Sequence, residues 1–382
     1  MDKVIYTPGH SREVDALILY GIVDTLNNLE ERESLEDVKI YPRGSYFEIH
    51  TTRSYGLDFY KKLLELNRQD YSDFALFKTK KAGALLPILG FQNEEKFIRE
   101  LWDTSNSITK RSVALDDLYS ERPSLQGWRM TPCKKHIKLI GTELMILYMA
   151  AAPMLGKYLY NYDNGLKENV YHRLCGLCYL LASQGLLAGA YKLNLRAARG
   201  RQIRAARDRQ IAYYIPTHET NADKIVSIQK AVKAKENILK VFEDFPTISL
   251  PIALLYDKDP TFLYVLESMG AILYSYRLIY TGQKIGVWAV RSVSDHPLQN
   301  YINFFKRMRE ESDTIRDIDK IFPLIKDSDF SYVFSTLSLA VLNNNPEIFY
   351  SFLRDYTSLA TRQNKALFSQ SFVEKAFEYF LS

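Results

Sequence analysis

Residues 3–26 read KVIYTPGHSREVDALILYGIVDTL, and this stretch passes from one pattern of apolar residues to another. Residues 3–6 are typical of a short strand, and Thr7-Pro8-Gly9 is a turn signal. From Ser11 onward, apolar residues recur every three or four positions, which predicts a helix with a buried face. A strand that leads through a tight turn into such a helix indicates a chain of mixed α and β structure.

Short strands and helices continue to alternate up to residue 296. Strands are predicted at residues 38–41, 46–52, 75–78, 211–215, 249–256 and 285–293. Helices are predicted at residues 57–66, 221–242 and 262–280, and residues 142–191 are apolar enough to form buried core helices.

After Pro297 the pattern is helical throughout. Asn345, Pro346 and Glu347 form an N-cap, a first-turn proline and a first-turn acid, and Ser371 with Glu374 fits a capping box for the last helix. We therefore expect an α+β fold, with a mixed N-terminal and central region of short strands and buried helices followed by an all-helical C-terminal module. The expected regions are an N-terminal α+β region (1–138), a central region with buried helices, an arginine-rich arm and strands (139–296), and the C-terminal module (297–382).

Composition and length indicate an ordinary globular protein. The chain has 382 residues, of which 47% are hydrophobic and 25% charged, enough for two or three domains with substantial cores. Three cysteines cannot all pair in disulfides, which indicates a reducing compartment. No apolar run follows the charged N-terminus, so we expect no signal peptide and a cytoplasmic location.

The most unusual segment is a tandem repeat at residues 195–210, LRAARGRQ followed by IRAARDRQ. Its six arginines and single aspartate give a net charge of +5, which equals the excess of 50 Lys and Arg over 45 Asp and Glu in the whole chain. The remaining residues are therefore balanced. Concentrated arginine favours a phosphate-binding surface, because guanidinium pairs with phosphate in a bidentate way and releases counterions.

The repeat does not fit an amphipathic helix. At 100° per residue its arginines point almost all round the axis, so we expect a surface arm that becomes ordered on a nucleic-acid backbone. A solvated linker without a ligand is the alternative. The predicted nucleic-acid-binding residues are Arg196, Arg199, Arg201, Arg204, Arg207 and Arg209, with Lys78, Lys80, Lys81, Lys134 and Lys135 from two further basic stretches.

Metal and catalytic motifs are weak. His172, Cys175 and Cys178 are spaced three apart, and Cys133 with His136 could complete a zinc site, but two cysteines inside an apolar run are more simply core residues. We expect no bound metal and no other cofactor.

Two further polar sites are also interpreted as structural. Asp257-Lys258-Asp259 before Pro260 could hold a divalent ion, although a turn explains it as well. His10 lies in a strand-to-helix loop with no accompanying nucleophile. The sequence also has no phosphate-binding loop, Rossmann fingerprint or HExxH motif, so we expect no catalytic residue and no enzymatic activity.

Residues 174–191 carry no charge and precede the arginine repeat, a pattern that would also fit a membrane-associated protein. Eighteen residues is the short end of the range for a span, and the run contains Ser183 and Gln184. Residues 139–155 are similarly apolar but contain Glu143 and Pro153. Buried core helices are therefore expected, with no membrane partner.

Two stretches carry a family resemblance. Residues 6–11, YTPGHS, run into LILYGIVDTL at 17–26, and NPEIFYSFLR lies at 345–354. Both resemble the large subunit of archaeal type I-A CRISPR interference (Cascade-like) complexes. The length and the mixed-then-helical order fit that family over most of the chain.

The resemblance implies a non-catalytic subunit that contacts the 5′ handle of the crRNA and helps to recognise the protospacer-adjacent motif (PAM) and target DNA. It also implies partner subunits: the backbone and small subunits, a helicase and a nuclease. The sequence leaves open whether the arginine arm holds RNA or DNA, and no PAM-reading residue carries over. The alternatives are a metal-dependent nuclease using Asp257 and Asp259, and a membrane-associated basic protein.

Overall fold

The computed structural model describes residues 3–29, 34–73, 113–123, 144–146, 173–196, 209–235, 240–242, 245–280 and 288–382. These residues form helices and mainly antiparallel strand pairs, and the regular elements from residue 299 onward are helices alone, which confirms the α+β class and the helical C-terminal end. The chain divides into two compact units, each assembled from three segments. Unit 1 comprises residues 1–191, 215–235 and 276–293, and unit 2 comprises 192–214, 236–275 and 294–382. The division into regions 1–138, 139–296 and 297–382 stays a prediction.

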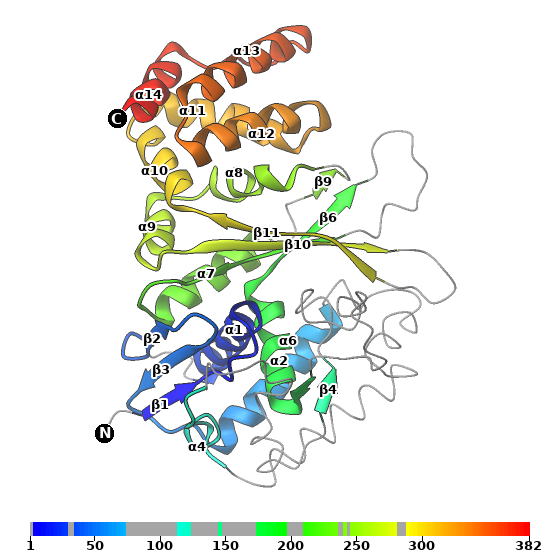
Figure 1. Cartoon of the computed structure of the whole chain (residues 1–382), viewed down its shortest axis with the longest axis vertical. Helices are drawn as coiled ribbons and strands as arrows, with labels where there is room; N and C mark the ends of the chain where they lie inside the picture. Colours follow the sequence, from blue (N-terminus) through cyan, green and yellow to red (C-terminus); the bar gives the residue numbers. More distant parts are fainter. Residues whose placement is uncertain are drawn as a thin grey trace, which may run out of the picture. The chain divides into compact units, whose positions relative to one another are not determined.

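Unit 1 contains a four-stranded sheet and the helices that pack with it (Figure 1). Its sheet has the order β1-β3-β2-β8, and the printed pairs are antiparallel. The strands are β1 (Lys3–Tyr6), β2 (Lys39–Pro42), β3 (Phe47–Thr51) and β8 (Thr220–Asn221). The helices are α1 (Arg12–Leu29), α2 (Leu57–Asp73), α4 (Leu115–Leu118), α6 (Gly176–Gly189) and α7 (Ala222–Lys235). A separate antiparallel pair joins β4 (Leu144–Ile146) and β5 (Arg173–Cys175).

Local sequence explains the start of unit 1. Gly9 has a φ of +77° in the turn after β1, and the Ser11 hydroxyl accepts a hydrogen bond from the Val14 amide at the start of α1. Gly44, with a φ of +72°, turns the hairpin between β2 and β3, where the Arg43 amide donates to the Tyr46 carbonyl at 2.8 Å. The predicted strand–turn–helix, hairpin and following helix are all confirmed.

Helices α1 and α6 lie side by side in unit 1 because glycines let their backbones approach closely (Figure 1). A Cβ added at Gly185 would lie 1.8 Å from the Leu17 carbonyl oxygen, and one at Gly21 would lie 2.0 Å from that of Leu181. The buried Asp24 carboxylate accepts a hydrogen bond from Gln184 on α6 at 2.8 Å. The apolar run at 174–191 is therefore largely a 14-residue core helix, α6, preceded by β5.

A five-stranded sheet has the order β11-β10-β7-β6-β9, and β6 pairs with β9 in parallel. Its strands are β6 (Tyr191–Arg196), β7 (Arg209–Ile215), β9 (Lys240–Phe242), β10 (Ile272–Tyr280) and β11 (Trp288–Pro297). The predicted helix at 221–242 was wrong at its end, because α7 stops at Lys235 and residues 240–242 pair with β6 instead. That pairing comes from a distant part of the chain, which local periodicity does not reveal.

Three other predictions were wrong. Residues 142–191 were expected to form buried helices, but residues 144–146 and 173–175 are the paired strands β4 and β5. The apolar run at 249–256 is helical, with η3 (Thr247–Ser249), a 3₁₀ turn, leading into α8 (Leu250–Leu255). Continuous apolar runs do not separate strand from buried helix, and Pro251 fits a helical first turn. The predicted helix at 262–280 is α9 (Pro260–Ser268) followed by β10, since Gly270 adopts a φ of +55° and ends the helix.

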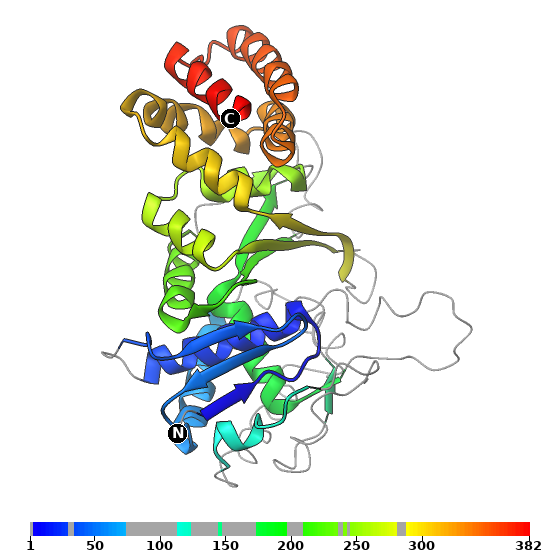
Figure 2. The same cartoon turned by 60° about the vertical axis from the view of Figure 1, so that its left-hand side comes forward.

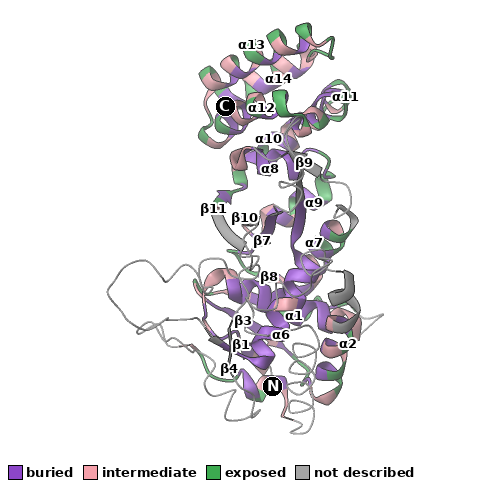
Figure 3. Ribbon diagram, turned by 90° about the vertical axis from the view of Figure 1, so that its right-hand side faces the viewer, coloured by how far each residue is buried: buried purple, intermediate pink, exposed green. Residues whose placement is uncertain are grey.

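Unit 2 ends in a bundle of helices, along which Figure 3 shows buried residues interspersed with exposed ones. Rings of phenylalanine contact one another between these helices. The helices are α10 (Gln299–Met308), α11 (Ser312–Ile321), η4 (Phe322–Lys326), α12 (Ser328–Asn343), α13 (Pro346–Arg362) and α14 (Gln370–Leu381). The Asn345 side chain caps α13 as predicted, accepting from the amides of Glu347 and Ile348. The predicted cap of α14 was wrong by two positions, because Ser369 accepts from the Phe372 amide.

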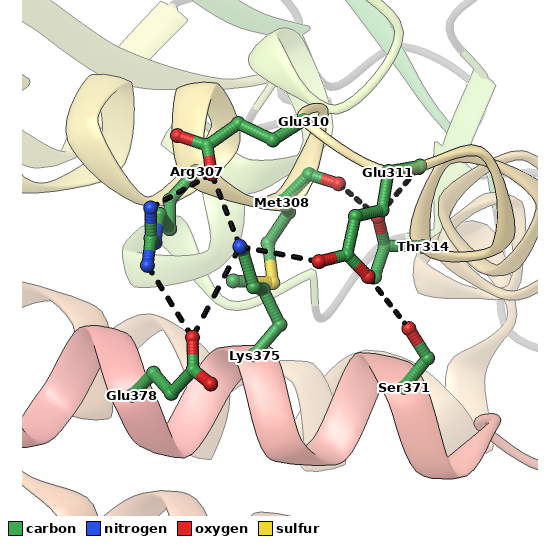
Figure 4. A network of polar contacts seen from close by, with 8 residues as sticks. All are labelled: Arg307, Met308, Glu310, Glu311, Thr314, Ser371, Lys375 and Glu378. Carbon is green, nitrogen blue, oxygen red and sulfur yellow. Dashed lines mark hydrogen bonds and ion pairs between the residues drawn. The ribbon is translucent and has the colours of Figure 1, made fainter.

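Ser371 instead belongs to a polar network between α14 and the loop after α10 (Figure 4). Lys375 on α14 forms ion pairs with Glu310 at 3.1 Å and Glu311 at 3.2 Å, and Glu311 accepts from the Ser371 hydroxyl at 2.9 Å. Figure 4 shows Glu378 facing Arg307, at a distance of 3.3 Å. These contacts join helices inside unit 2, so the network has a structural role.

Candidate nucleic-acid interface

The predicted nucleic-acid-binding residues fall mainly outside the described residues. This holds for Arg199, Arg201, Arg204, Arg207, Lys78, Lys80, Lys81, Lys134 and Lys135. Arg196 is the last residue of β6, and Arg209 is the first residue of β7. Their assignment to a nucleic-acid interface stays a prediction.

The two ends of the arginine-rich segment differ from the expected free arm. Strands β6 and β7 are neighbours in the five-stranded sheet, so residues 197–208 connect two adjacent strands and are tethered at both ends. Gln210, predicted to lie in the arm, is only 4% exposed in β7. Pairing within the sheet satisfies the backbone of these end residues, which extends both strands into the charged repeat.

A second basic and aromatic surface lies on the four-stranded sheet of unit 1. Paired residues on neighbouring strands share a face. Ile5, Ile49 and Ile40 are paired in register and fully buried, which marks the face toward the core. Tyr6, Glu48 and Tyr41 are the next register line and therefore lie on the opposite face. Figure 2 shows the strands of this sheet on one side of α1.

We call this opposite surface the tyrosine–arginine face. It comprises residues of β1, β2 and β3, the β2–β3 hairpin and the segment after α4. Its members are Tyr6, Lys39, Tyr41, Arg43, Tyr46, Glu48, His50 and Arg122.

The cations of the face gather round one carboxylate. Glu48 is 7% exposed, and its Oε2 lies 2.9 Å from a terminal nitrogen of Arg43. The Arg122 Nε lies 3.8 Å from the other carboxylate oxygen and donates to the Tyr46 hydroxyl at 2.7 Å. The two arginine side chains remain 45% and 66% exposed. Glu48 therefore fixes both guanidinium groups at the surface without burying them.

The rings of the face lie beside these cations. The Tyr41 ring meets that of His50 edge-on at 4.8 Å, and the Arg43 guanidinium lies 5.7 Å from the Tyr41 ring centre. The Tyr6 and Tyr46 ring centres are 6.4 Å apart. Tyr6, Tyr41 and His50 are each partly exposed, whereas Tyr46 is buried beneath Arg122. Two partly exposed tyrosines thus lie on β1 and β2, the two strands that flank β3.

Local interactions keep the cations of this face charged. Its hydrogen bond to Glu48 raises the pKa of Arg43, and a bond to the Tyr46 hydroxyl raises the pKa of Arg122. Burial and the nearby Glu219 carboxylate raise the pKa of Tyr41. The face therefore carries permanent positive charges beside neutral phenol rings, an arrangement suited to anions and flat aromatic ligands.

The other predicted polar sites have structural roles where they are described. His10 is buried, and the Asp15 carboxylate accepts hydrogen bonds from the amides of Gly9 at 2.8 Å, His10 at 2.7 Å and Ser11 at 3.2 Å. Burial raises the pKa of Asp15 despite these bonds. The start of α1 is therefore closed by the helix's own carboxylate.

Asp259 also acts as a helix cap. Its Oδ1 accepts from the Phe262 amide at 2.9 Å at the start of α9, which supports the interpretation of residues 257–259 as a turn. Lys258 between the two acids lies over the Phe262 ring at 4.8 Å.

Cys175 and Cys178 are fully buried around the start of α6. The Cys175 sulfur accepts from the Cys178 amide, and the Cys178 sulfur lies 3.2 Å from the Tyr119 hydroxyl. Within the described residues, no group of three His, Cys, Asp or Glu is placed to hold a metal ion. Cys133, His136 and His172 lie outside them. Searched over the same residues, none of the helices combines the length and apolar character of a membrane span.

Sequence reasoning missed the tyrosine–arginine face, although a signal was present. Residues 39–43 read KIYPR and 46–50 read YFEIH, so aromatic or charged residues alternate with apolar ones in both strands of the predicted hairpin. Attention to the polar side of that alternation would have grouped Tyr41, Arg43, Tyr46, Glu48 and His50. The contribution of Arg122 depends on tertiary structure alone.

Comparison with known families gives one result that covers nearly the whole chain. The family model of a CRISPR-associated protein, Cas_Csa4, matches residues 3–374. A search of curated proteins finds no match.

Proposed function

The chain belongs to the CRISPR-associated Cas_Csa4 family, and on that premise we propose that it is a non-catalytic, nucleic-acid-binding large subunit of an interference complex. In this role it holds the 5′ handle of the crRNA and helps to recognise the PAM and target DNA. It works with backbone and small subunits, a helicase and a nuclease. Its site of action is the cytoplasm.

The observation that carries the proposal is the arginine repeat. Residues 195–210 hold a net charge of +5, while the rest of the chain is balanced. The repeat connects two neighbouring strands, so a phosphate backbone bound there would be fixed to a sheet at both ends of the segment. Arginine forks suit phosphate, and the released counterions favour binding.

A holding role needs no cleavage chemistry. Asp259 uses a carboxylate oxygen to cap α9, and Lys258 places a cation between Asp257 and Asp259, the two acids of the nuclease alternative. Both features disfavour a magnesium-dependent nuclease. Incubation of the purified chain with labelled RNA and DNA in Mg²⁺ or Mn²⁺ should leave both intact, and cleavage that disappears in D257A/D259A would refute the non-catalytic assignment.

Salt dependence tests the binding role directly. Each phosphate contact contributes a slope of about −0.7 to −0.9 in a plot of log affinity against log salt. Replacement of Arg199, Arg201, Arg204 and Arg207 by Ala spares the strand-end arginines, and we expect it to flatten the slope by roughly three. Fluorescence anisotropy with labelled RNA and DNA at several salt concentrations measures the slope.

A matched control removes the same charge elsewhere. Arg316, Lys320, Arg354 and Arg362 are exposed on the C-terminal helices, and their joint replacement by Ala should leave the slope unchanged. If both sets of substitutions flattened the salt slope equally, the affinity would depend on the net charge of the chain and not on a particular binding site. An unchanged slope in the repeat variant would remove the repeat from the interface.

The assembly role has a separate test. Affinity purification of the full chain from cells that carry the whole interference system should recover short RNA of uniform length together with partner subunits. Recovery of the chain alone, from cells in which the partner subunits are expressed, would contradict a role as a complex subunit.

A further inference from the structure

The tyrosine–arginine face offers something that the arginine repeat lacks, namely aromatic rings beside cations. Residues 195–210 contain no aromatic side chain, so the repeat can neutralise phosphates but cannot stack on bases. On the sheet, Tyr6 and Tyr41 are partly exposed and lie on the two strands that flank β3. Strands in a sheet are about 4.8 Å apart, so the backbone positions that carry these rings are about 10 Å apart across β3. The rings are therefore placed to stack on two different bases.

The order of elements is one that antiparallel RNA-binding sheets use. The chain runs β1, α1, β2, β3, α2, and β3 lies between β1 and β2. In such sheets, aromatic side chains on the open face stack two or three unpaired bases while the helices pack behind. Here residues after α4 follow the outer edge of β1, where the Tyr6 amide donates to the Tyr119 carbonyl at 2.8 Å. The segment after α4 therefore covers the free edge of β1, and it does so without covering the tyrosine–arginine face.

The cations are positioned for phosphates at the rim of the rings. Arg43 lies at the β2–β3 hairpin, Arg122 lies next to Tyr46, and Lys39 is exposed at the other end of β2. A guanidinium has five N–H donors, so an arginine held by Glu48 can also contact a phosphate. Glu48 thereby orders the two arginines in advance, which reduces the entropy lost on binding.

We propose that the tyrosine–arginine face binds unpaired nucleotides of a single-stranded RNA, with bases stacked on Tyr6 and Tyr41 and phosphates on Arg43 and Arg122. This inference rests on the proposed nucleic-acid-binding function and adds a second site that recognises bases. Stacking on exposed rings excludes a paired duplex, in which the base faces are covered. The two sites divide the work, because the repeat contacts backbone and the face contacts bases.

The sugar specificity is assigned to Glu219. This exposed carboxylate directly precedes β8, and the pairing of Thr220 with Ile40 brings it beside Tyr41, the residue on whose ring a base would stack. A carboxylate repels phosphate but accepts a hydrogen bond from a ribose 2′-hydroxyl, as acidic residues do in dinucleotide sites. A deoxyribose strand lacks this donor, so RNA is the favoured ligand.

Stacking is tested with a short single-stranded RNA of about eight nucleotides that carries 2-aminopurine, a base whose fluorescence falls when it stacks. Binding to the full chain should quench the probe. In Tyr41→Leu the ring is lost while an apolar side chain remains, and we expect affinity to fall about ten-fold with a loss of quenching. Tyr41→Phe keeps the ring and should retain both. Unchanged quenching in a folded Tyr41→Leu protein would overturn the proposal.

A second variant guards against misfolding. Arg122→Gln alters a side chain that is 66% exposed. It should weaken RNA binding and flatten the plot of log affinity against log salt by about 0.7 to 0.9, the slope of one phosphate contact. Glu219→Gln should reduce the preference for RNA over the same DNA sequence. If the wild-type chain binds and quenches both sugars equally, the assignment to RNA is wrong.

The two sites fail in distinguishable ways. If Tyr41→Leu changes nothing while the repeat variant flattens the salt slope, the face inference fails and the proposed function stands. If the wild-type chain binds neither RNA nor DNA at low salt, the proposed function fails as well. Tyrosine and arginine are also common anchors in protein interfaces. Loss of a partner subunit in Tyr41→Leu, with RNA quenching intact, would therefore assign the face to a protein instead.

Discussion

Two regions of this chain are rich in aromatic side chains and use them in opposite ways. In the C-terminal helices, Phe322 is fully buried, and its ring centre lies 5.4 Å from that of Phe334 and 5.7 Å from that of Phe305. On the tyrosine–arginine face, Tyr41 is partly exposed and its neighbours are His50 and Arg43. A ring surrounded by rings stabilises the fold, whereas a ring beside cations at the surface can contact a ligand. Burial, and not aromatic content, separates the two uses.

The largest expected effect tests the buried side of this comparison. Phe322→Ala removes a ring that contacts aromatic side chains of several helices in unit 2, so the free energy of unfolding should fall by about 3–5 kcal/mol. Urea denaturation followed by circular dichroism measures the loss. Tyr350→Ala, at a side chain that is 62% exposed, is the control and should change stability by about 0.5 kcal/mol or less. Equal losses in the two variants would break the comparison.

The second largest effect tests how much the close packing of α1 against α6 contributes to the stability of unit 1. Gly185→Ala would place a Cβ 1.8 Å from the Leu17 carbonyl oxygen, and the two helices must move apart to admit it. We expect a loss of about 3 kcal/mol, at the upper end of ordinary overpacking. Gly56→Ala is a matched control, since no heavy atom outside its chain neighbours lies within 4 Å of the added carbon. If Gly185→Ala were as stable as Gly56→Ala, the close approach of α1 and α6 would be wrong.

The third effect concerns a buried side chain of unit 2, His296, whose burial makes stability depend on pH. Burial lowers the pKa of His296 from 6.5 to about 4. The folded state therefore binds fewer protons than the unfolded state between these values, and its stability rises with pH through that window and is lost as pH falls through it. The free energy of unfolding that is lost over this window is about 3 kcal/mol. His296→Asn should flatten the stability curve between about pH 4 and 6.5, relative to its value at pH 7.5. Parallel curves for the two proteins would show that His296 is not the group responsible.

The smallest effect concerns the polar network of Figure 4. The carboxylate partners of Lys375 are 48–59% exposed, so solvent screens their attraction. Lys375→Met should lower the melting temperature far less than Phe322→Ala does, and the difference from wild type should shrink at high salt. A loss as large as that of Phe322→Ala would show that ion pairs, and not ring contacts, hold these helices together.

Local sequence was sufficient for several elements. Thr7-Pro8-Gly9 ends β1 and introduces α1, the hairpin at 43–46 joins β2 to β3, and Asn345 caps α13. Each of these depends on residues a few positions apart, which a single stretch of sequence contains. The arginine repeat was likewise found from the sequence, although the strands that extend into its two ends were not.

Tertiary structure decided the rest. Residues 249–256 are uniformly apolar, so periodicity did not distinguish a strand from the buried helix α8. Strand β9 exists because it pairs with β6, more than forty positions earlier in the chain. The tyrosine–arginine face needs the register of three strands and a side chain, Arg122, from a distant segment. The sequence alone determined the α+β class, the helical C-terminal end and the concentration of charge, because these follow from local spacing and composition. Which rings are buried and which lie beside cations follows from pairing and packing between distant residues, so only the folded chain determined it.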